Sequence, residues 1–440
     1  MNYHGYFYQP KSIFMKKRIV KFILIGIIIG LSNLDAFSQF SISAEMRPRY
    51  EFRNGYKTLP ISSTIPANVI TQRSRLNFES QMENLDFKLS LQDVRTWGDV
   101  KVKDDLASTF INEAWVELKL NSPLSIKLGR QKLKYDDQRL FAVANWNNVS
   151  ISHDLALIKY ENSTFKSHIG FAFNNEKEKN AESYYPVNFY KALTFVWLSK
   201  EINEQLTISF IDILDGNQKE NTDNTIYGRN TLGPNIHYNI PSVDLRLSGN
   251  FYYQHGKEVT GKDVNAYFYS LKAQKRFSNL GVDLGFDFYS GTNGLDTTRT
   301  EVNTFNKLYG AGHKFNGHMD YFTNTYTQTK NGGLSDLYLN IKYAVNDKIN
   351  IGSTLHYLSL ASNVIDPDYS GSGLQAIDKY LGTEIDFYVD YQFTPDITLN
   401  AGYSMMFAQE SMEVIKGGDS DELANWAFMM LVIKPTLFSK

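Results

Sequence analysis

Segments of about ten residues in which apolar and polar side chains alternate recur along the chain after Gln39. In residues 383–391, the apolar side chains of Ile385, Phe387 and Val389 alternate with polar and acidic ones. The same pattern is found in residues 86–92 and 243–251. Because successive side chains of a strand point to opposite faces, each segment is predicted to be a strand with one apolar and one polar face.

About eighteen such segments are present, and the connections between them alternate between long and short. The long connections are 54–70, 98–107, 134–149, 174–190, 215–226, 256–262, 290–333, 359–381 and 407–423. A soluble β-sandwich has no reason to collect its long loops at one end, whereas an outer-membrane barrel has short periplasmic turns and long external loops. We therefore predict an all-β fold: a transmembrane antiparallel up-and-down β-barrel of about 18 strands, with short periplasmic turns and long extracellular loops.

The alternation also indicates which solvent each face meets. In lipid every backbone polar group needs a partner, and only closure removes the edges of a sheet. A closed barrel would turn the Leu-, Phe- and Tyr-rich faces towards lipid and the charged faces towards a water-filled lumen. The chain has no cysteine, which excludes disulfides, thiolate metal sites and cysteine nucleophiles.

The first 38 residues have the features of a secretory signal peptide. A basic stretch begins at Met15, the expected true start, and an apolar core covers residues 22–31 before the small residues Ala36 and Ser38. Removing five basic residues and one acidic residue leaves 40 Lys+Arg against 46 Asp+Glu, a net charge of −6. Residues 39–440 are expected to form a single barrel domain in the outer membrane of a Gram-negative bacterium, without nucleic acid as a partner.

The densest charge on the polar faces lies near the amino terminus. Arg47 and Arg49 share the inward face of the first predicted strand, and Arg73 and Arg75 that of the second. The neighbouring strands add Lys88, Gln92, Lys127 and Gln131. Guanidinium groups suit carboxylates, and a row of them would pass an anion from one weak contact to the next. The alternative is that these cations pair with Glu45, Glu51, Glu79 and Asp86 and hold the wall together.

A second polar stretch, GRQKLKYDDQRLF at residues 129–141, leaves a strand and enters a long loop. A loop that folds inward would narrow the pore with Tyr135, Asp136 and Asp137, whereas a solvated surface loop would explain the same composition. Carboxylate pairs of this kind also suit calcium outside the cell. No cofactor is expected, and calcium in the extracellular loops is the alternative left open.

Residues 309–322, YGAGHKFNGHMDYF, combine His313, His318 and Asp320. A zinc site needs three or four ligands held by further hydrogen bonds. This stretch offers two histidines and one aspartate, separated by Gly312 and Gly317. An ordered loop packed in or over the pore, as part of a lid, is therefore favoured over a metal site.

Three stretches of the chain resemble the alginate export family of outer-membrane porins: RPRYEFRN at 47–54, GRQKLKYDDQRLF at 129–141 and FNKLYGAGHKFNGHMDYF at 305–322. The resemblance implies a monomeric eighteen-stranded barrel whose electropositive lumen passes an anionic uronate polymer. It assigns to the selectivity path Arg47, Arg49, Arg73, Arg75, Arg130 and Arg139. The chain departs from the family in its net acidic charge and in Phe438, which lies two residues before the end.

Other functional classes fit less well. The chain has no G-x-S-x-G or H-E-x-x-H motif, and no stretch before the first strand is long enough for the plug of an energised receptor. We predict a passive outer-membrane channel, not an enzyme, for anionic saccharides such as alginate or for organic anions. The alternative is a general, weakly selective porin. Expected partners are lipid, lipopolysaccharide and the anionic solute, with secretion or uptake partners in the periplasm left open.

Overall fold

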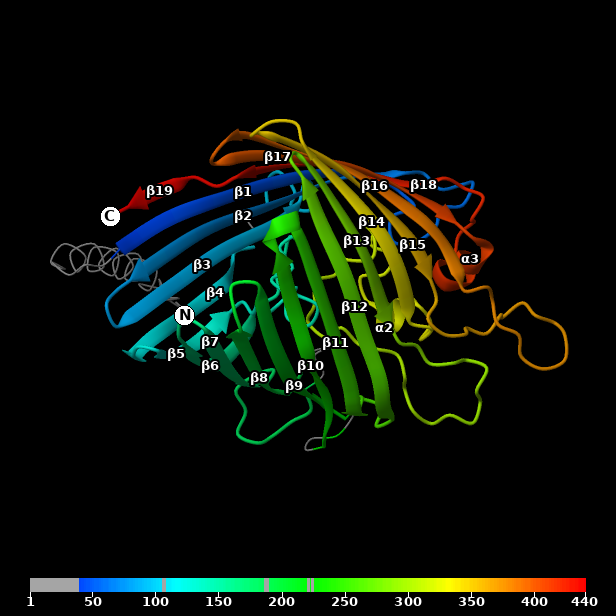
Figure 1. Cartoon of the computed structure of the whole chain (residues 1–440), viewed down its shortest axis with the longest axis horizontal. Coiled ribbons are helices and arrows are strands. Elements are labelled where there is room, and N and C mark those ends of the chain that lie inside the picture. The colour runs from blue at the N-terminus through cyan, green and yellow to red at the C-terminus, as the bar shows by residue number, and fades with distance from the viewer. Residues whose placement is uncertain (1–38, 105–107, 186–189, 220–221, 223–224) are drawn as a thin grey trace, which may run out of the picture.

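The computed structural model describes residues 39–104, 108–185, 190–219, 222 and 225–440. The signal peptide predicted for residues 1–38 lies outside the described residues. The described chain forms one antiparallel sheet that closes on itself (Figure 1).

The strands alternate in direction around the sheet. They are β1 (Gln39–Asn54), β2 (Ala67–Gln81), β3 (Leu85–Thr96), β4 (Phe110–Asn121), β5 (Leu124–Gln131), β6 (His153–Glu161), β7 (Phe165–Phe173), β8 (Ala192–Glu201), β9 (Leu206–Gln218), β10 (Ile226–Ile240), β11 (Leu245–Lys257), β12 (Asp263–Phe277), β13 (Leu280–Tyr289), β14 (Leu334–Ala344), β15 (Ile349–Ser359), β16 (Tyr380–Thr394), β17 (Ile397–Ala408), β18 (Ala424–Ile433) and β19 (Thr436–Ser439).

Closure occurs between the two ends of the chain. β1 pairs with β2 on one side and with both β18 and β19 on the other. Pro435 stands between β18 and β19, and proline has no N–H with which to continue a hydrogen-bonded strand. β18 and β19 are therefore two parts of one last strand, and the barrel has 18 strands. The predicted fold class and strand number are confirmed.

The outer face of the barrel is apolar, as the alternation predicts. Phe87, Leu247 and Phe387 point outward with exposed fractions of 41%, 39% and 45%. Their neighbours in sequence point into the barrel and are mostly polar. No helix in the described part of the chain is long and apolar enough to cross a membrane.

Short and long connections lie at opposite ends of the barrel. The short turns, which include the 3-10 helix η2 (Pro241–Val243), lie at the end of the barrel that also holds β19 and the start of β1 (Figure 1). The long connections carry α2 (Thr325–Gln328) and α3 (Glu410–Lys416) at the other end. This arrangement agrees with the predicted periplasmic turns and extracellular loops.

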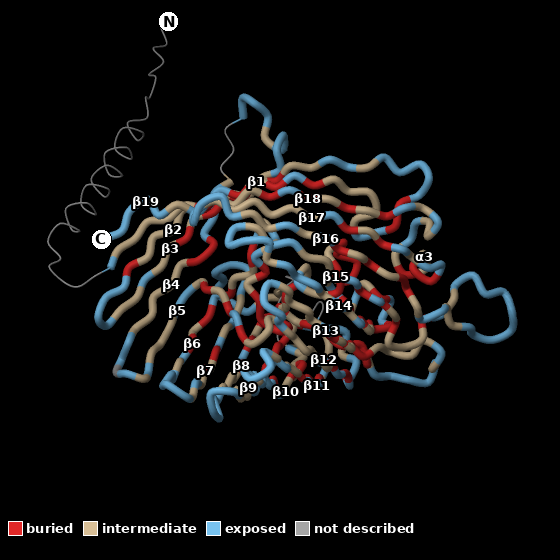
Figure 2. Tube along the Cα trace, turned by 45° about the horizontal axis from the view of Figure 1, so that its top comes forward, coloured by how far each residue is buried: buried red, intermediate tan, exposed pale blue. Residues whose placement is uncertain are grey.

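Two of the long loops fold into the barrel and supply much of its buried apolar core. The 132–152 loop contributes Leu133 and Phe141, and the 290–333 loop contributes Tyr309 and Tyr321. Figure 2 shows the buried residues gathered towards the end that carries α3. The predicted water-filled lumen does not extend through this half of the barrel, because apolar side chains of the loops pack there.

Candidate functional site

Arg47 and Arg49 of β1 and Arg73 and Arg75 of β2, here called the arginine wall, all point into the barrel. Arg47 lies directly opposite Arg73 in the strand pairing, and Glu45 lies opposite Arg75. All four arginines are at least 92% buried, with exposed fractions between 0% and 8%. Such burial requires hydrogen-bond partners for every guanidinium.

The 132–152 loop provides most of these partners through its backbone. Arg47 donates to the carbonyl oxygens of Asn145, Trp146 and Asn147 at 2.5, 3.0 and 3.0 Å. Arg73 donates to the carbonyls of residues 145 and 147, and Arg49 donates to that of residue 146 at 2.8 Å. The turn at residues 145–147 therefore points its carbonyl groups at the arginine wall.

Carboxylates compensate only part of the charge of this wall. Arg49 pairs with Glu51 at 2.8 Å, and Arg73 pairs with Glu45. Arg75 instead donates to neutral groups, the side chains of Gln92 at 2.5 Å and Ser150 at 3.0 Å. Four arginines thus face two carboxylates, and Arg53 also shares Glu51. An open row of guanidinium groups that hand an anion along was the expectation, and it is wrong here, because loop carbonyls occupy these donors.

The other predicted lining residues point inward from β3 and β5. Lys88 pairs with Glu79 at 2.9 Å and with Glu113 at 3.4 Å. The Nζ atom of Lys127 lies 3.6 Å from the ring centre of Trp115. Gln131 is fully buried and donates from Nε2 to the carbonyl oxygen of residue 155 at 3.2 Å. These contacts bind the wall together, which was the alternative left open by the sequence.

Arg130 lies on the outer face of the barrel, so its assignment to the solute path is corrected. Along β5 the inward positions are Lys127 and Gln131, and alternation turns Arg130 outward. Its guanidinium pairs at 2.8 Å with Asp154, which lies opposite on β6 and is 61% exposed. Gly129 has a φ of +113°, and a Cβ there would lie 2.3 Å from the carbonyl oxygen of residue 114. The glycine of the GRQ motif therefore fits tight backbone packing.

The YDD segment packs against the barrel wall and does not extend into solvent. Tyr135 lies 3.0 Å from Nδ1 of His168 on β7. Asp136 accepts hydrogen bonds from Trp197 and Ser209 of β8 and β9 at 3.1 and 2.6 Å. Asp137 accepts from Asn250 of β11 at 3.0 Å. These side chains attach the 132–152 loop to strands that lie far from the arginine wall.

Arg139 connects the 132–152 loop to β13. It is 4% exposed and pairs at 2.6 Å with Asp287 and at 3.1 Å with Asp137. It also donates to the hydroxyl of Tyr289 at 2.6 Å, and its guanidinium carbon lies 3.5 Å from the ring centre of Phe315 in the 290–333 loop. Arg139 therefore holds both loops against the wall.

The histidine segment of the 290–333 loop lies inside the barrel. His313 Nδ1 lies 2.8 Å from Asp320, and the His313 ring stacks on Trp146 with centroids 3.9 Å apart. His318 stacks on His313 at 5.1 Å. Asp320 also accepts from the hydroxyl of Tyr56. Burial would raise the pKa of Asp320, but His313 and Tyr56 hold it below its usual value.

A group of acidic side chains, here called the carboxylate wall, receives this loop. It consists of Asp287 of β13, Asp336 of β14, and Glu384 and Asp386 of β16, all at most 1% exposed. The backbone N–H of Met319 donates to Glu384 at 2.7 Å, and that of His318 donates to Asp386 at 3.3 Å. His356 of β15 lies 2.9 Å from Asp336.

Gly317 allows the loop to approach Glu384 this closely. Its φ is +92°, and a Cβ at this position would lie 2.5 Å from the Glu384 carboxyl group. The carboxylate wall and Trp146 were missed as site residues in the sequence. The alternation of residues 383–391 already placed Glu384 and Asp386 on the inward face, so that signal was present, whereas nothing local indicates Trp146.

Across the described parts of the chain, no group of three or more histidine and acidic side chains is arranged to hold a metal ion. The histidine segment instead makes ring contacts and hydrogen bonds that join the two loops.

The family model for alginate export matches residues 38–423, which include nearly the whole barrel. The chain belongs to the alginate export family. No curated protein matches it. Membership in this family makes the chain a channel of the Gram-negative outer membrane and not an enzyme.

Solved structures show the same fold at low sequence identity. OccAB1 of Acinetobacter baumannii is 13% identical with a TM-score of 0.60, and the match covers 92% of this chain and 100% of that one. OccD3 (OpdP) of Pseudomonas aeruginosa is 12% identical with a TM-score of 0.59, covering 91% and 92%. OccK8 (OprE) of the same organism is 10% identical with a TM-score of 0.57, covering 91% and 98%.

Proposed function

We propose that this channel favours anionic solutes, and that uronate-type saccharides such as alginate are the solute class. The observation that carries the proposal is the charge balance of the arginine wall. The side chains of Arg47 and Arg75 donate hydrogen bonds to neutral oxygen atoms, and these bonds do not cancel their charge. Arginine stays protonated in proteins, so this side of the lumen keeps a positive potential.

The arginines act through their field, because the 132–152 loop covers them. An anion that passes along this loop meets polar groups at its surface and the positive potential beneath. Weak attraction of this kind lets a solute enter and leave again, as conduction requires. The membership of the chain in the alginate export family supports the choice of uronates.

Reversal potentials in planar bilayers under a salt gradient test the proposal, with uronate oligomers added as blockers. The wild-type channel is expected to be anion-selective and to be blocked by the oligomers. The variant R47Q/R75Q removes two charges whose partners are neutral, and its reversal potential should move towards cation selectivity.

The paired variant E45Q/R73Q is the matched control, because it removes one charge of each sign. Its reversal potential should stay near that of the wild type. A wild-type channel that is cation-selective and unaffected by uronates would overturn the proposal and leave the barrel assignment intact.

The carboxylate wall favours a second candidate function, a weakly selective porin for small solutes. Four acidic side chains line the same lumen as the arginine wall. If their field balances that of the arginines, the wild-type reversal potential will lie near zero, and R47Q/R75Q will make the channel cation-selective.

We also propose that the channel acts as a monomer. Pairing of β1 with β2 on one side and with β18 and β19 on the other leaves this strand no free edge for a second chain. The apolar outer face then meets lipid and lipopolysaccharide. Cross-linking in outer membranes, followed by mass analysis, tests this point and should yield a single chain.

A further inference from the structure

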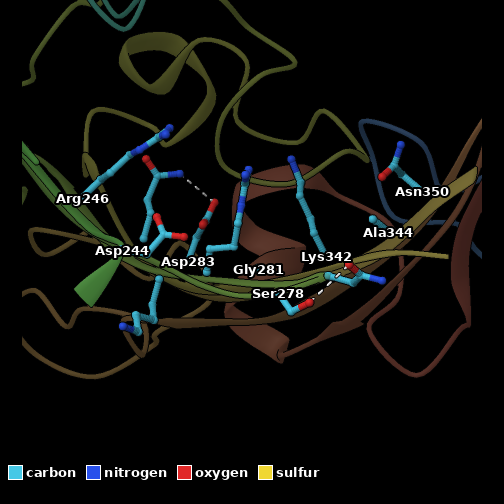
Figure 3. A pocket seen from close by; sticks show the side chains of 12 residues that line it. Asp244, Arg246, Ser278, Gly281, Asp283, Lys342, Ala344 and Asn350 are labelled. Atoms are coloured by element: carbon cyan, nitrogen blue, oxygen red, sulfur yellow. Dashed lines mark hydrogen bonds between the residues drawn. The ribbon is translucent and has the colours of Figure 1, made fainter. Parts of the chain in front are cut away.

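A pocket of about 480 Å³ opens inside the barrel at the end with the short turns, away from the two inward loops. Its lining comes from the turn at Asp244, the turn at Ser278 and Asn279, and the adjoining ends of β11 to β15. This volume lies in the range of small-molecule sites. Figure 3 shows Arg246 and Lys342 extending to the same side of the sheet, with Gly281 between them.

The pocket carries an excess of positive charge. Arg246, Arg276 and Lys342 line it together with two carboxylates, those of Asp244 and Asp283, for a net charge of +1, whereas Lys275 of the same lining lies at an outward position of β12. The carboxylate of Asp283 already accepts from Lys272 and Gln274, both at 3.2 Å. Lys275 donates to the carbonyl oxygen of Val243 in the turn.

Three of these cations have no acidic partner. Within the residues that the structure describes, the side chains of Arg246, Arg276 and Lys342 make no ion pair or hydrogen bond, and all three are exposed. The nearest aromatic contact of Lys342 is with Tyr388, at 5.8 Å from Nζ to the ring centre. These cations differ in this respect from the arginine wall, where each guanidinium donates hydrogen bonds to the loop or to neighbouring side chains.

The strand register leaves a hollow between two of them. Arg276 lies opposite Gly281, and Gly281 lies opposite Lys342 on the next strand. A glycine between two cations gives an anion room to approach the sheet and to meet both charges. Charge-assisted hydrogen bonds from guanidinium and ammonium groups to carboxylate are the strong ones.

We propose that Arg246, Arg276 and Lys342 form an anion-docking site at the periplasmic mouth, which takes a carboxylate-bearing saccharide. The amide side chains of Asn279 and Asn350 in the same lining offer hydrogen bonds to sugar hydroxyls. The site lies before the loop-filled half of the barrel, so it concentrates anionic solute at the channel mouth. The docking of an anion stands on these residues alone, whereas the choice of a uronate rests on the proposed function.

Calorimetric titration of the detergent-solubilised full barrel with tri-galacturonate tests the site. Low ionic strength is used because salt screens exposed charges. The wild type should bind tri-galacturonate and not the neutral trisaccharide maltotriose. The variant R246Q/R276Q/K342Q should raise the Kd about tenfold or more. R130Q removes a cation from the outer face of the barrel and should leave the Kd unchanged.

A second variant keeps every charge. In G281V, the new Cβ would lie 3.8 Å from the Cβ of Lys342, an ordinary contact, so the strand accepts it while the hollow is filled. This variant should also weaken tri-galacturonate binding. A wild type that binds no tri-galacturonate, or a triple variant that binds as the wild type does, overturns the site.

The reversal potential separates this site from the proposed function. Lost binding in the triple variant together with retained anion selectivity assigns docking to the mouth and selectivity to the arginine wall. A cation-selective wild type that still binds tri-galacturonate at these residues would overturn the proposed function and keep the site.

Discussion

Both the arginine wall and the carboxylate wall contain buried charges that hydrogen-bond to the backbone of an inward loop, but they use opposite groups of the peptide. At the arginine wall, carbonyl oxygens of residues 145–147 accept from buried guanidinium groups. At the carboxylate wall, backbone N–H groups of His318 and Met319 donate to buried carboxylates. Each peptide carries a donor and an acceptor, so an inward loop can satisfy either sign of buried charge.

Neither wall is fully neutralised by its partners, since Glu384 of the carboxylate wall accepts from the neutral backbone N–H of Met319. Arg47 and Arg75 meet neutral partners, and their charge persists. Asp287 meets the guanidinium of Arg139, and Asp336 meets His356. Hydrogen bonds alone therefore do not determine the electrostatic field of the lumen. A buried charge is cancelled only where its partner carries the opposite charge.

The two loops are also joined to each other, so neither wall is independent of the other. Tyr309 donates to the carbonyl of Leu140, and Ala142 donates to that of Tyr309, both at 3.0 Å. Trp146 stacks on His313 on one side, and the guanidinium carbon of Arg49 lies 4.3 Å from its ring centre. A substitution at one wall is therefore expected to alter how the loop packs at the other wall.

Loss of Arg139 should have the largest effect, because it is the charged link between the loops and the carboxylate wall. R139M leaves the buried Asp287 without its cation, and breaking a buried pair costs about 3–5 kcal/mol. Trypsin cleavage at the exposed Lys134 should become much faster, and the single-channel conductance should rise as the loop leaves the lumen.

The double variant R139M/D287N removes both charges and should be cleaved more slowly than R139M. If R139M and the wild type are cleaved at the same rate, the two loops are held in place without this link.

A smaller effect is expected from Gly317, which tests the backbone contact with the carboxylate wall. In G317A the methyl group meets the Glu384 carboxyl and the residue keeps a positive φ, a strain of about 1–3 kcal/mol. Trypsin cleavage at Lys314 in the same loop measures the opening that results.

G373A is the matched control, because Gly373 has a φ of +93° and no atom within 4 Å of an added Cβ. It carries the same backbone strain without the clash. Equal cleavage at Lys314 in the two variants would mean that close approach to Glu384 contributes nothing to loop packing.

The smallest effect should come from pH, through Lys307 in the 290–333 loop. Burial, with help from the charge of Arg139, lowers the pKa of Lys307 to about 7. In an opened loop the pKa returns to about 10.4, so the open state binds the extra proton between these values. Packing of the loop is therefore strongest above about pH 10 and weakens as pH falls towards 7, by at most about 1.4 kcal/mol per pH unit.

Open-channel current noise should accordingly be higher at pH 7 than at pH 9. K307M removes the titrating group and should make the noise independent of pH over this range. A K307M channel as pH-sensitive as the wild type would assign the effect to another group.

Much of the fold could be predicted because a barrel strand is recognised locally. The period of two in residues 383–391 fixes both the strand and the inward position of Glu384, without knowledge of its neighbours. The site was harder to predict. The same rule would have placed Arg130 outside, since Gln131 points inward, but resemblance to a family motif outweighed it.

The sequence by itself determined the closed barrel, the end at which the long loops lie and the inward positions of the arginine wall, because alternation and connection length are properties of short segments. Only the tertiary structure decided what those arginines touch. Their partners come from a loop about a hundred residues away, and a mouth pocket of five adjoining strands collects the cations that no loop covers. Pairing depends on which distant groups fold together, and no local pattern records that.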